Sequence, residues 1–272
     1  MIDFYWIYDI PTWQLGVLSV ASITIPSILC LALTRRWIYR TFHVCSDIDE
    51  SVNGFFAGVG VLLGLLMGLV AVAAWENYDA VDDVVAKEAA QVAAIYRDIS
   101  TLETSKKHEL QADLRDYLVY VIDVAWPGHH RGEVPSGGTV ILTKFLHHLT
   151  QYRAKTPEQQ IFLAEIFAAY NKLIDVRRVR MSLVNSGLPA VFWVTILAGS
   201  FFTILVTFFF HIPFLKTHVV LSGIFSAFLG FMIFLLAAVD NPFRGEVSVS
   251  SEPYAQLLRT LDILDPEKLN LQ

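Results

Sequence analysis

Carboxylate residues gather at both ends of one apolar stretch of the sequence. Those after the stretch are Glu76, Asp79, Asp82 and Asp83, and those before it are Asp47, Asp49 and Glu50. If copies of the chain assembled around an axis, each position would form a ring of carboxylates, and such rings concentrate cations and repel anions. A solvated helix end accounts for any single one of these residues, so the argument for cations rests on the two clusters together.

No other titratable residues form a catalytic or metal-binding pattern. His129–His130 and His147–His148 are neighbours in sequence, so on a helix each pair diverges by about 100°, whereas helical metal ligands prefer i, i+4 spacing. The 2 cysteines offer no disulfide framework or zinc site. Phosphate-loop and nucleophile-triad motifs are missing from the sequence. We expect solvated histidines, no metal, no cofactor and no enzyme; a pH-sensing histidine stays open.

The chain has two different compositions. Of its 272 residues 54% are hydrophobic and 17% are charged, against about 25% charged in soluble domains. Four stretches contain no charged residue, namely 15–33, 55–75, 188–210 and 219–239. Each is about 20 residues long, which lets a helix cross a bilayer. The net charge of −6 and the pI of 5.7 exclude a basic nucleic-acid-binding surface. We expect four transmembrane helices with the lipid bilayer as a partner.

These spans define four regions: two spans in 1–75, a polar region in 76–187, two spans in 188–239 and a tail in 240–272. Apolar residues recur at helical spacing in the polar region, and Gly68 is the only glycine or proline in 67–104. The second span should therefore continue as one helix over about 53–103. Further helices are expected over 106–126, ended by Pro127–Gly128, over 139–152, and from Pro157, capped by Thr156, to about 184. The tail should hold a short strand at 246–250 and a helix at 253–264. The predicted fold is an all-α integral membrane protein with a helical bundle inserted between spans 2 and 3.

Glycines recur in rows along the second span: Gly54 and Gly58, then Gly60, Gly64 and Gly68. Such rows let another helix approach closely. The approaching helix is either another span of the same chain or the same span of a second copy. In the second case an apolar constriction that gates by dewetting would be formed by Leu62, Leu65, Leu66, Leu69 and Val72.

Positive residues give two conflicting indications of orientation. Arg35, Arg36 and Arg40 place the loop at 34–54 in the cytoplasm. A larger set places the bundle and both termini there instead: Lys87, Lys172, Arg177, Arg178, Arg180 and Arg244. We expect the second arrangement.

Two short motifs outside the spans are specific. Glu88–Ala89 with Tyr96–Arg97 follows the second span, and Asp240–Asn241–Pro242–Phe243–Arg244–Gly245 follows the fourth. Glu88 and Arg97 do not share a helix face, so each should pair with another helix, and Arg244 should hold the tail against the bundle. With two spans on either side of a helical insert, these motifs resemble the bestrophin-like family of bacterial membrane proteins (the DUF4239 group).

The resemblance implies kinship with bestrophins, which are oligomeric ion channels with four spans per subunit, a pore lined by the second span and a large cytoplasmic helical region. It implies a homo-oligomer in the bacterial inner membrane that passes inorganic ions. Animal bestrophins select anions, whereas the acidic clusters here favour cations. The spans contain no charged residue, which argues against an ion-coupled transporter. Three readings remain: a cation channel, which we favour, a bestrophin-type anion channel, and a membrane-anchored scaffold that conducts nothing.

Overall fold

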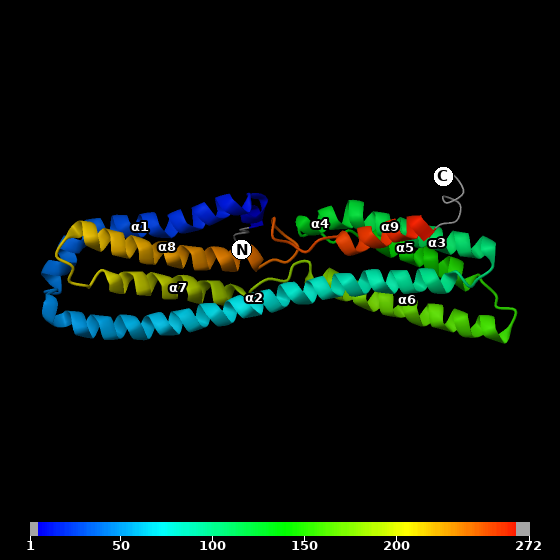
Figure 1. Ribbon diagram of the computed structural model, residues 1–272, viewed down its shortest axis with the longest axis horizontal. Helices are drawn as coiled ribbons and strands as arrows, with labels where there is room; N and C mark the ends of the chain where they lie inside the picture. The colour runs from blue at the N-terminus through cyan, green and yellow to red at the C-terminus, as the bar shows by residue number, and fades with distance from the viewer. Residues whose placement is uncertain (1–4, 265–272) are drawn as a thin grey trace. The chain divides into compact units, whose positions relative to one another are not determined.

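Helices provide almost all the regular structure of residues 5–264, the part of the chain that this computed structural model describes (Figure 1). No strand occurs within these residues, so the prediction of a strand at 246–250 is wrong. An isolated strand has no neighbour with which to form a hydrogen-bonded ladder. The Val249 N–H instead donates to the carbonyl of Pro242, 2.8 Å away. Contacts divide the chain into two compact units.

The first unit holds the helices that are long and apolar enough to cross a membrane. They are α1 (Thr12–Thr41), the first part of α2 (Asp49–Ile99), α7 (Ala190–Thr207) and α8 (Leu215–Val239), with the short turns η1 (Tyr5–Asp9) and η2 (Ser46–Ile48). The four predicted stretches fall on these four helices. On α2, Leu63, Met67 and Val70 are buried against α7 and α8, so one face of α2 forms part of the unit's core.

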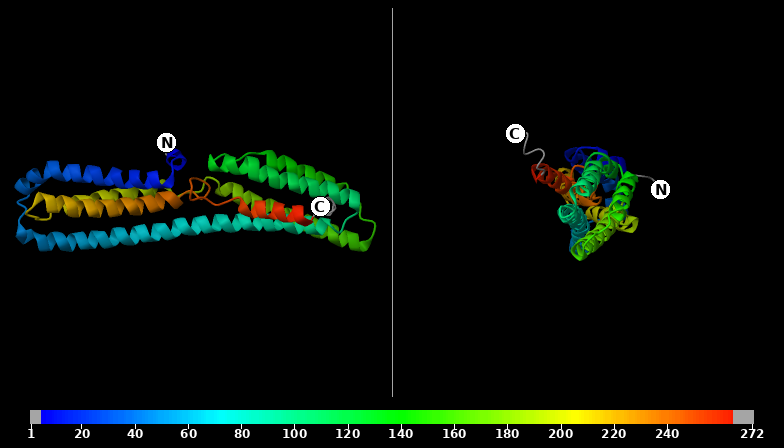
Figure 2. Two further views of the ribbon diagram at one scale, coloured as in Figure 1. Left: turned by 45° about the horizontal axis from the view of Figure 1, so that its top comes forward. Right: turned by 90° about the vertical axis from the view of Figure 1, so that its right-hand side faces the viewer.

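Small residues bring α1 and α8 together within this unit (Figure 2). A Cβ added to Gly230 would lie 2.7 Å from the Cα of Val20, closer than side chains allow. Ser226 donates to Ser27 across the same interface, 3.2 Å away. Close backbone approach and small hydroxyls are typical of packed membrane helices.

α2 has 51 residues in one uninterrupted helix, as the scarcity of glycine and proline predicts. At 1.5 Å per residue it is about 75 Å long. Its second part belongs to the second unit, which also contains α3 (Thr104–Tyr120), the π-helical turn η3 (Val121–Ala125), α4 (Trp126–His130), α5 (Gly137–Thr150), α6 (Pro157–Leu183) and α9 (Glu252–Leu264). Thr156 caps α6 by accepting the Gln159 N–H at 3.3 Å. The core of this unit includes Val85 and Val92 of α2 together with Leu114, Phe145 and Tyr254.

The prediction that Pro127–Gly128 ends the second helix of the polar region is wrong. The helical path runs through η3 and on to His130. A proline lacks an N–H, and its ring collides with the carbonyl four residues earlier in an α-helix. The wider π-helical turn directly before Pro127 displaces those carbonyls, so the ring fits without ending the helix.

Candidate functional site

One face of α2 is left uncovered, opposite the face that packs in the first unit. Its residues follow each other at alternating spacings of four and three, which keeps them on one side of a helix. All are exposed, and we call them the α2 stripe: Gly58, Leu62, Leu65, Leu69, Val72, Glu76, Asp79 and Asp83. The stripe therefore changes from apolar to acidic along the helix.

The apolar part of the α2 stripe is strongly exposed. Leu62, Leu65, Leu69 and Val72 are between 56% and 69% accessible. Leu66, the fifth candidate for an apolar constriction, is only half-exposed and packs against the core of the first unit. Four of the five candidates thus face away from their own unit.

The glycine rows do not pack against the helices of their own unit. A Cβ added at Gly54, Gly58, Gly60, Gly64 or Gly68 would meet no atom within 4 Å. The alternative of packing within one chain is not realised in the first unit. Each glycine inside a helix costs about 1 kcal/mol relative to alanine. A surface that faces only lipid gives no reason for five of them, whereas close approach of another helix does.

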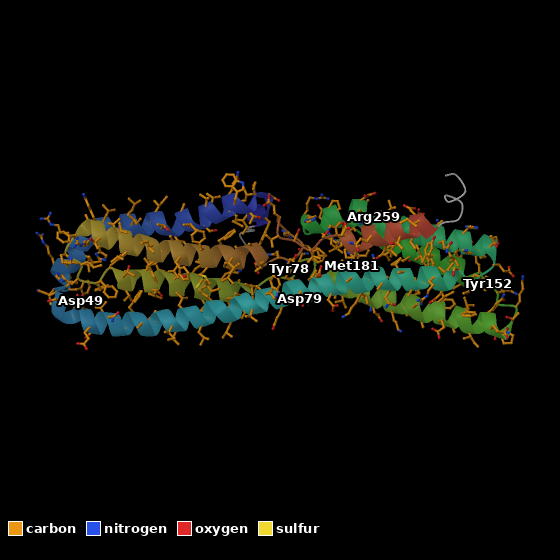
Figure 3. All side chains as sticks on the ribbon, viewed as in Figure 1. Asp49, Tyr78, Asp79, Tyr152, Met181 and Arg259 are labelled. Atoms are coloured by element: carbon orange, nitrogen blue, oxygen red, sulfur yellow. The ribbon has the colours of Figure 1, made fainter. Side chains whose placement is uncertain are left out.

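The carboxylates after the span are exposed along α2, and Figure 3 labels Asp49 and Asp79 near the two ends of the apolar segment. Glu76, Asp79 and Asp82 form no ion pair within residues 5–264, while Asp83 pairs with Lys87 one turn on. Burial and the charge of Asp82 raise the pKa of Tyr78.

The carboxylates before the span are Asp47, Asp49 and Glu50, and the surroundings of the last two differ. Asp49 accepts the backbone N–H of His211 at 2.8 Å, which ties the start of α2 to the segment after α7. Glu50 is exposed, and the side chain of Asp47 lies outside the described part. Three carboxylates after the span and Glu50 before it are therefore exposed without an ion pair within the described residues.

Glu88 lies at the centre of a buried polar network in the second unit. Its carboxylate accepts Nε of Arg180 at 2.7 Å, Nη2 of Arg180 at 3.2 Å and the Tyr117 hydroxyl at 2.5 Å. Glu88 is 0% and Arg180 2% accessible, so the charge pair is withdrawn from water. Burial lowers the pKa of Arg180, but the charge of Glu88 outweighs this and holds that pKa above its usual value.

The prediction of solvated histidines is wrong for His129, which is 2% accessible and extends the network to α4. Its Nδ1–H donates to the carbonyl of Glu133 at 3.0 Å, so its Nε2 lone pair is free to accept Nη1 of Arg180 at 2.5 Å. Burial, and then the charge of Arg180, lower the pKa of His129 from 6.5 to about 4. The network therefore joins α2, α3, α4 and α6 through a neutral histidine.

Tyr96 and Arg97, the second half of the first motif, make other contacts. The Tyr96 hydroxyl accepts weakly from Arg115 at 3.4 Å, and Arg115 donates to Asp262 of α9 at 2.6 Å. Arg97 is exposed and pairs with its neighbour Asp98. Glu88 and Arg97 are thus separate features, as their spacing predicts, but the prediction that Arg97 pairs with another helix is wrong, because it pairs with Asp98 of α2.

The tail motif is fixed within the second unit at Pro242–Arg244. The Phe243 ring lies edge-on to Trp126 at 5.5 Å and to His129 at 5.4 Å. Arg244 donates to Asn185 at 3.0 Å, and Gly132, with φ +75°, has no Cβ that would occupy the space of its guanidinium. Gly245, at φ +80°, has the backbone conformation that favours glycine. Arg244 thus holds the tail through an amide.

Arg180, the charge partner of Glu88, is the main residue of the site that the sequence does not predict. Buried residues of α6 and of the position directly after it follow a helical stripe, Ile166, Tyr170, Leu173, Arg177, Arg180 and Val184. Two arginines on an otherwise apolar stripe are a readable signal of buried ion pairing. Tyr117 and His129 carry no such signal, because a tyrosine or histidine on a buried face is common.

The family is decided by a match over most of the chain. The family model described as bestrophin-like domain matches residues 21–254. The chain belongs to the bestrophin-like family. No curated protein matches the sequence.

Solved structures similar to this bestrophin-like chain include a bacterial bestrophin homologue from Klebsiella pneumoniae. Two structures of its variants have TM-scores of 0.64 and 0.65 at 13% identity, covering 93% of this chain and 98% and 99% of theirs. A third, of the homologue solved by Zn-SAD phasing, has a TM-score of 0.61 at 12% identity and covers 92% and 97%. At this identity the likeness establishes the fold.

Proposed function

We propose that copies of this chain form a symmetric homo-oligomer in a bacterial inner membrane, with their α2 helices around a pore that conducts ions and favours cations. The observation that carries the proposal is the uncovered α2 stripe, which runs from glycine and leucine into carboxylates. Membership of the bestrophin-like family supports it, because bestrophins are oligomeric ion channels.

The apolar part of the stripe would form the narrow section of the pore. The alternating spacing of four and three is the repeat by which helices pack side by side. Rings of Leu62, Leu65, Leu69 and Val72 would exclude water when closed and so act as a gate. The glycine rows would let neighbouring α2 helices approach.

The acidic part would set the selectivity. Rings of Glu76 and Asp79 at the end of the apolar section would concentrate cations before they enter, with Asp82 beside them. Asp83 would contribute less, because Lys87 pairs with it. The second unit, with both termini, would lie in the cytoplasm and form a vestibule.

The test is ion flux through purified protein in liposomes under opposed potassium and chloride gradients. We expect a reversal potential near that of potassium. The triple variant Asp79→Asn, Asp82→Asn, Asp83→Asn should move it towards zero, with a potassium-to-chloride permeability ratio lower by about a few-fold.

A matched triple variant keeps the loss of charge but moves it away from α2. Glu158→Gln, Glu165→Gln and Asp175→Asn also remove three exposed carboxylates, one of them paired with an arginine. This control should keep the original reversal potential. An unchanged potential in the α2 variant would remove the acidic-ring mechanism. A potential near that of chloride would indicate an anion channel, and no flux would indicate a scaffold.

A further inference from the structure

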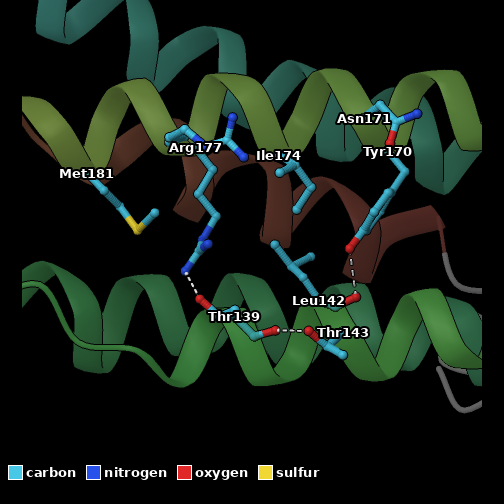
Figure 4. A pocket seen from close by; sticks show the side chains of 9 residues that line it. Thr139, Leu142, Thr143, Tyr170, Asn171, Ile174, Arg177 and Met181 are labelled. Carbon is cyan, nitrogen blue, oxygen red and sulfur yellow. Dashed lines mark hydrogen bonds between the residues drawn. The ribbon is translucent and has the colours of Figure 1, made fainter.

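A groove between α5 and α6 of the second unit contains a buried cation without a counter-ion (Figure 4). Arg177 is only 6% accessible, yet its Nε has no acceptor, and no ion pair within residues 5–264 includes it. Its one hydrogen bond runs from Nη2 to the Thr139 hydroxyl at 3.0 Å. A buried charge without a partner is costly, so the site favours an anion.

Neither Asp175 of α6 nor Glu88 of α2 supplies that anion. Asp175 pairs with the exposed Arg178, with an N–O distance of 3.7 Å. Glu88 is held by Arg180 one helical turn further along α6. Arg177 therefore differs from Arg180, which occupies the same buried stripe and has a carboxylate.

The α5 side of the groove adds a second attraction for negative charge. Thr139 lies in the first turn of this 14-residue helix, where the helix dipole is positive, although its own N–H already donates to the carbonyl of Ser136 at 2.9 Å. Gly138 has no Cβ, which would otherwise lie 3.3 Å from Nη2 of Arg177. The guanidinium is thus held against the positive end of α5.

The rest of the groove is partly apolar and large enough for a small molecule, and its polar lining includes Thr143, Asn171 and the exposed Arg178. Its volume is about 330 Å³, and Leu142, Ile174 and Met181 line it beside Arg177. One buried cation matches a single negative charge, and a guanidinium binds a planar carboxylate through two parallel hydrogen bonds. Apolar walls favour a short hydrocarbon part.

We propose that this groove binds a small organic monocarboxylate, with its oxygens on Arg177 and Thr139 and its carbons against Leu142, Ile174 and Met181. The proposal does not depend on ion conduction, because it is tested by binding alone.

The experiment measures thermal unfolding of the full chain in detergent with sodium butyrate, sodium acetate, sodium phosphate or sodium chloride at equal ionic strength. Butyrate should raise the Tm saturably, more than acetate, while chloride and phosphate should not. Arg177→Gln should weaken the apparent affinity more than about tenfold. Arg131→Gln, which removes an exposed guanidinium, should leave it unchanged.

A second variant covers the case in which Arg177→Gln does not fold. Thr139→Asp places a carboxylate beside Arg177 and in the first turn of α5, so it should raise the Tm without ligand and abolish the response to butyrate. No saturable effect of butyrate on the unaltered chain, a response to phosphate alone, or an undiminished response in Thr139→Asp would overturn the proposal.

Discussion

His129 is a neutral histidine in direct contact with a buried guanidinium. The unfolded chain takes up a proton on this side chain near pH 6.5, whereas the folded chain does so only near its lowered pKa of about 4. Between these values the unfolded state binds more protons. The contribution of His129 to stability is therefore complete above pH 6.5 and is lost as the pH falls towards 4.

The corresponding prediction concerns acid stability. The full shift corresponds to about 3 kcal/mol, of which part is lost between about pH 7 and about pH 5. The Tm of the full chain in detergent should fall over this range. His129→Gln keeps an acceptor for Arg180 but cannot be protonated, so its Tm should fall less steeply.

His130, the neighbour of His129, adds its own pH dependence to the Tm of both proteins. Burial lowers its pKa as well, so a shallower slope will remain in His129→Gln. The double variant with His130→Gln should be flatter still. Parallel curves for the unaltered chain and His129→Gln would contradict the assignment of the neutral tautomer.

At the scale of residues, the sequence predicts the motif that contains Glu88 but not the partner of Glu88. The motif around Glu88 was recognisable, but the identity of its partner depends on which helix face lies opposite, and spacing along α2 contains no such information. Arg177 and Arg180 are three residues apart on one buried stripe, yet only Arg180 has a carboxylate. That difference follows from tertiary packing.

At the scale of elements, α2 separates two kinds of glycine. Gly230 of α8 is needed within the chain, since a Cβ there would collide with α1. Gly64 of α2 has open space around it. Its substitution should therefore affect partners of the chain while sparing its fold.

We predict that Gly64→Leu disrupts the oligomer and leaves the subunit folded. Leucine is the better helix former by about 1 kcal/mol, so the isolated subunit should be slightly more stable. Light scattering with size-exclusion chromatography in detergent measures the assembly, and circular dichroism measures the helix content. Ala198→Leu, at an exposed position of α7, is the matched control and should assemble normally. Assembly by Gly64→Leu as complete as that of the control would place the subunit contact elsewhere.

The continuity of α2 and the helical path through Pro127 show where the prediction of elements from sequence succeeds and where it fails. The absence of helix breakers over a long periodic segment was enough to predict one helix. Proline normally breaks a helix, but the π-helical turn η3 before Pro127 makes room for its ring. A five-residue π-helical turn has no compositional signature, so the sequence predicts a helix end at Pro127 although the helical path runs on to His130.

At the scale of the whole molecule, the distribution of charge alone predicts the four helices that are long and apolar enough to cross a membrane, because burial in lipid excludes charge over about 20 residues. The prediction of orientation counts Arg177, Arg180 and Arg244 among its positive residues, and all three are buried. A direct test is available because Cys45 is exposed in the segment between α1 and α2.

We predict that Cys45 faces away from the cytoplasm. In a Cys30→Ser background, a membrane-impermeant maleimide should label it in intact spheroplasts. Ser105→Cys, at the exposed start of α3, should be labelled only after the membrane is broken. The reverse pattern would place the second unit outside the cytoplasm.

The tail also fixes the order in which the molecule can be completed during translation. Phe243, Val249, Tyr254 and Leu261 belong to the same core as Val85 and Leu114, although α7 and α8 lie between them in sequence. A ribosome must therefore deliver both final membrane helices before the last of these side chains becomes available. Until then Trp126 and His129 lack the Phe243 ring, and chains released early by a premature stop codon expose the core of the second unit to proteases.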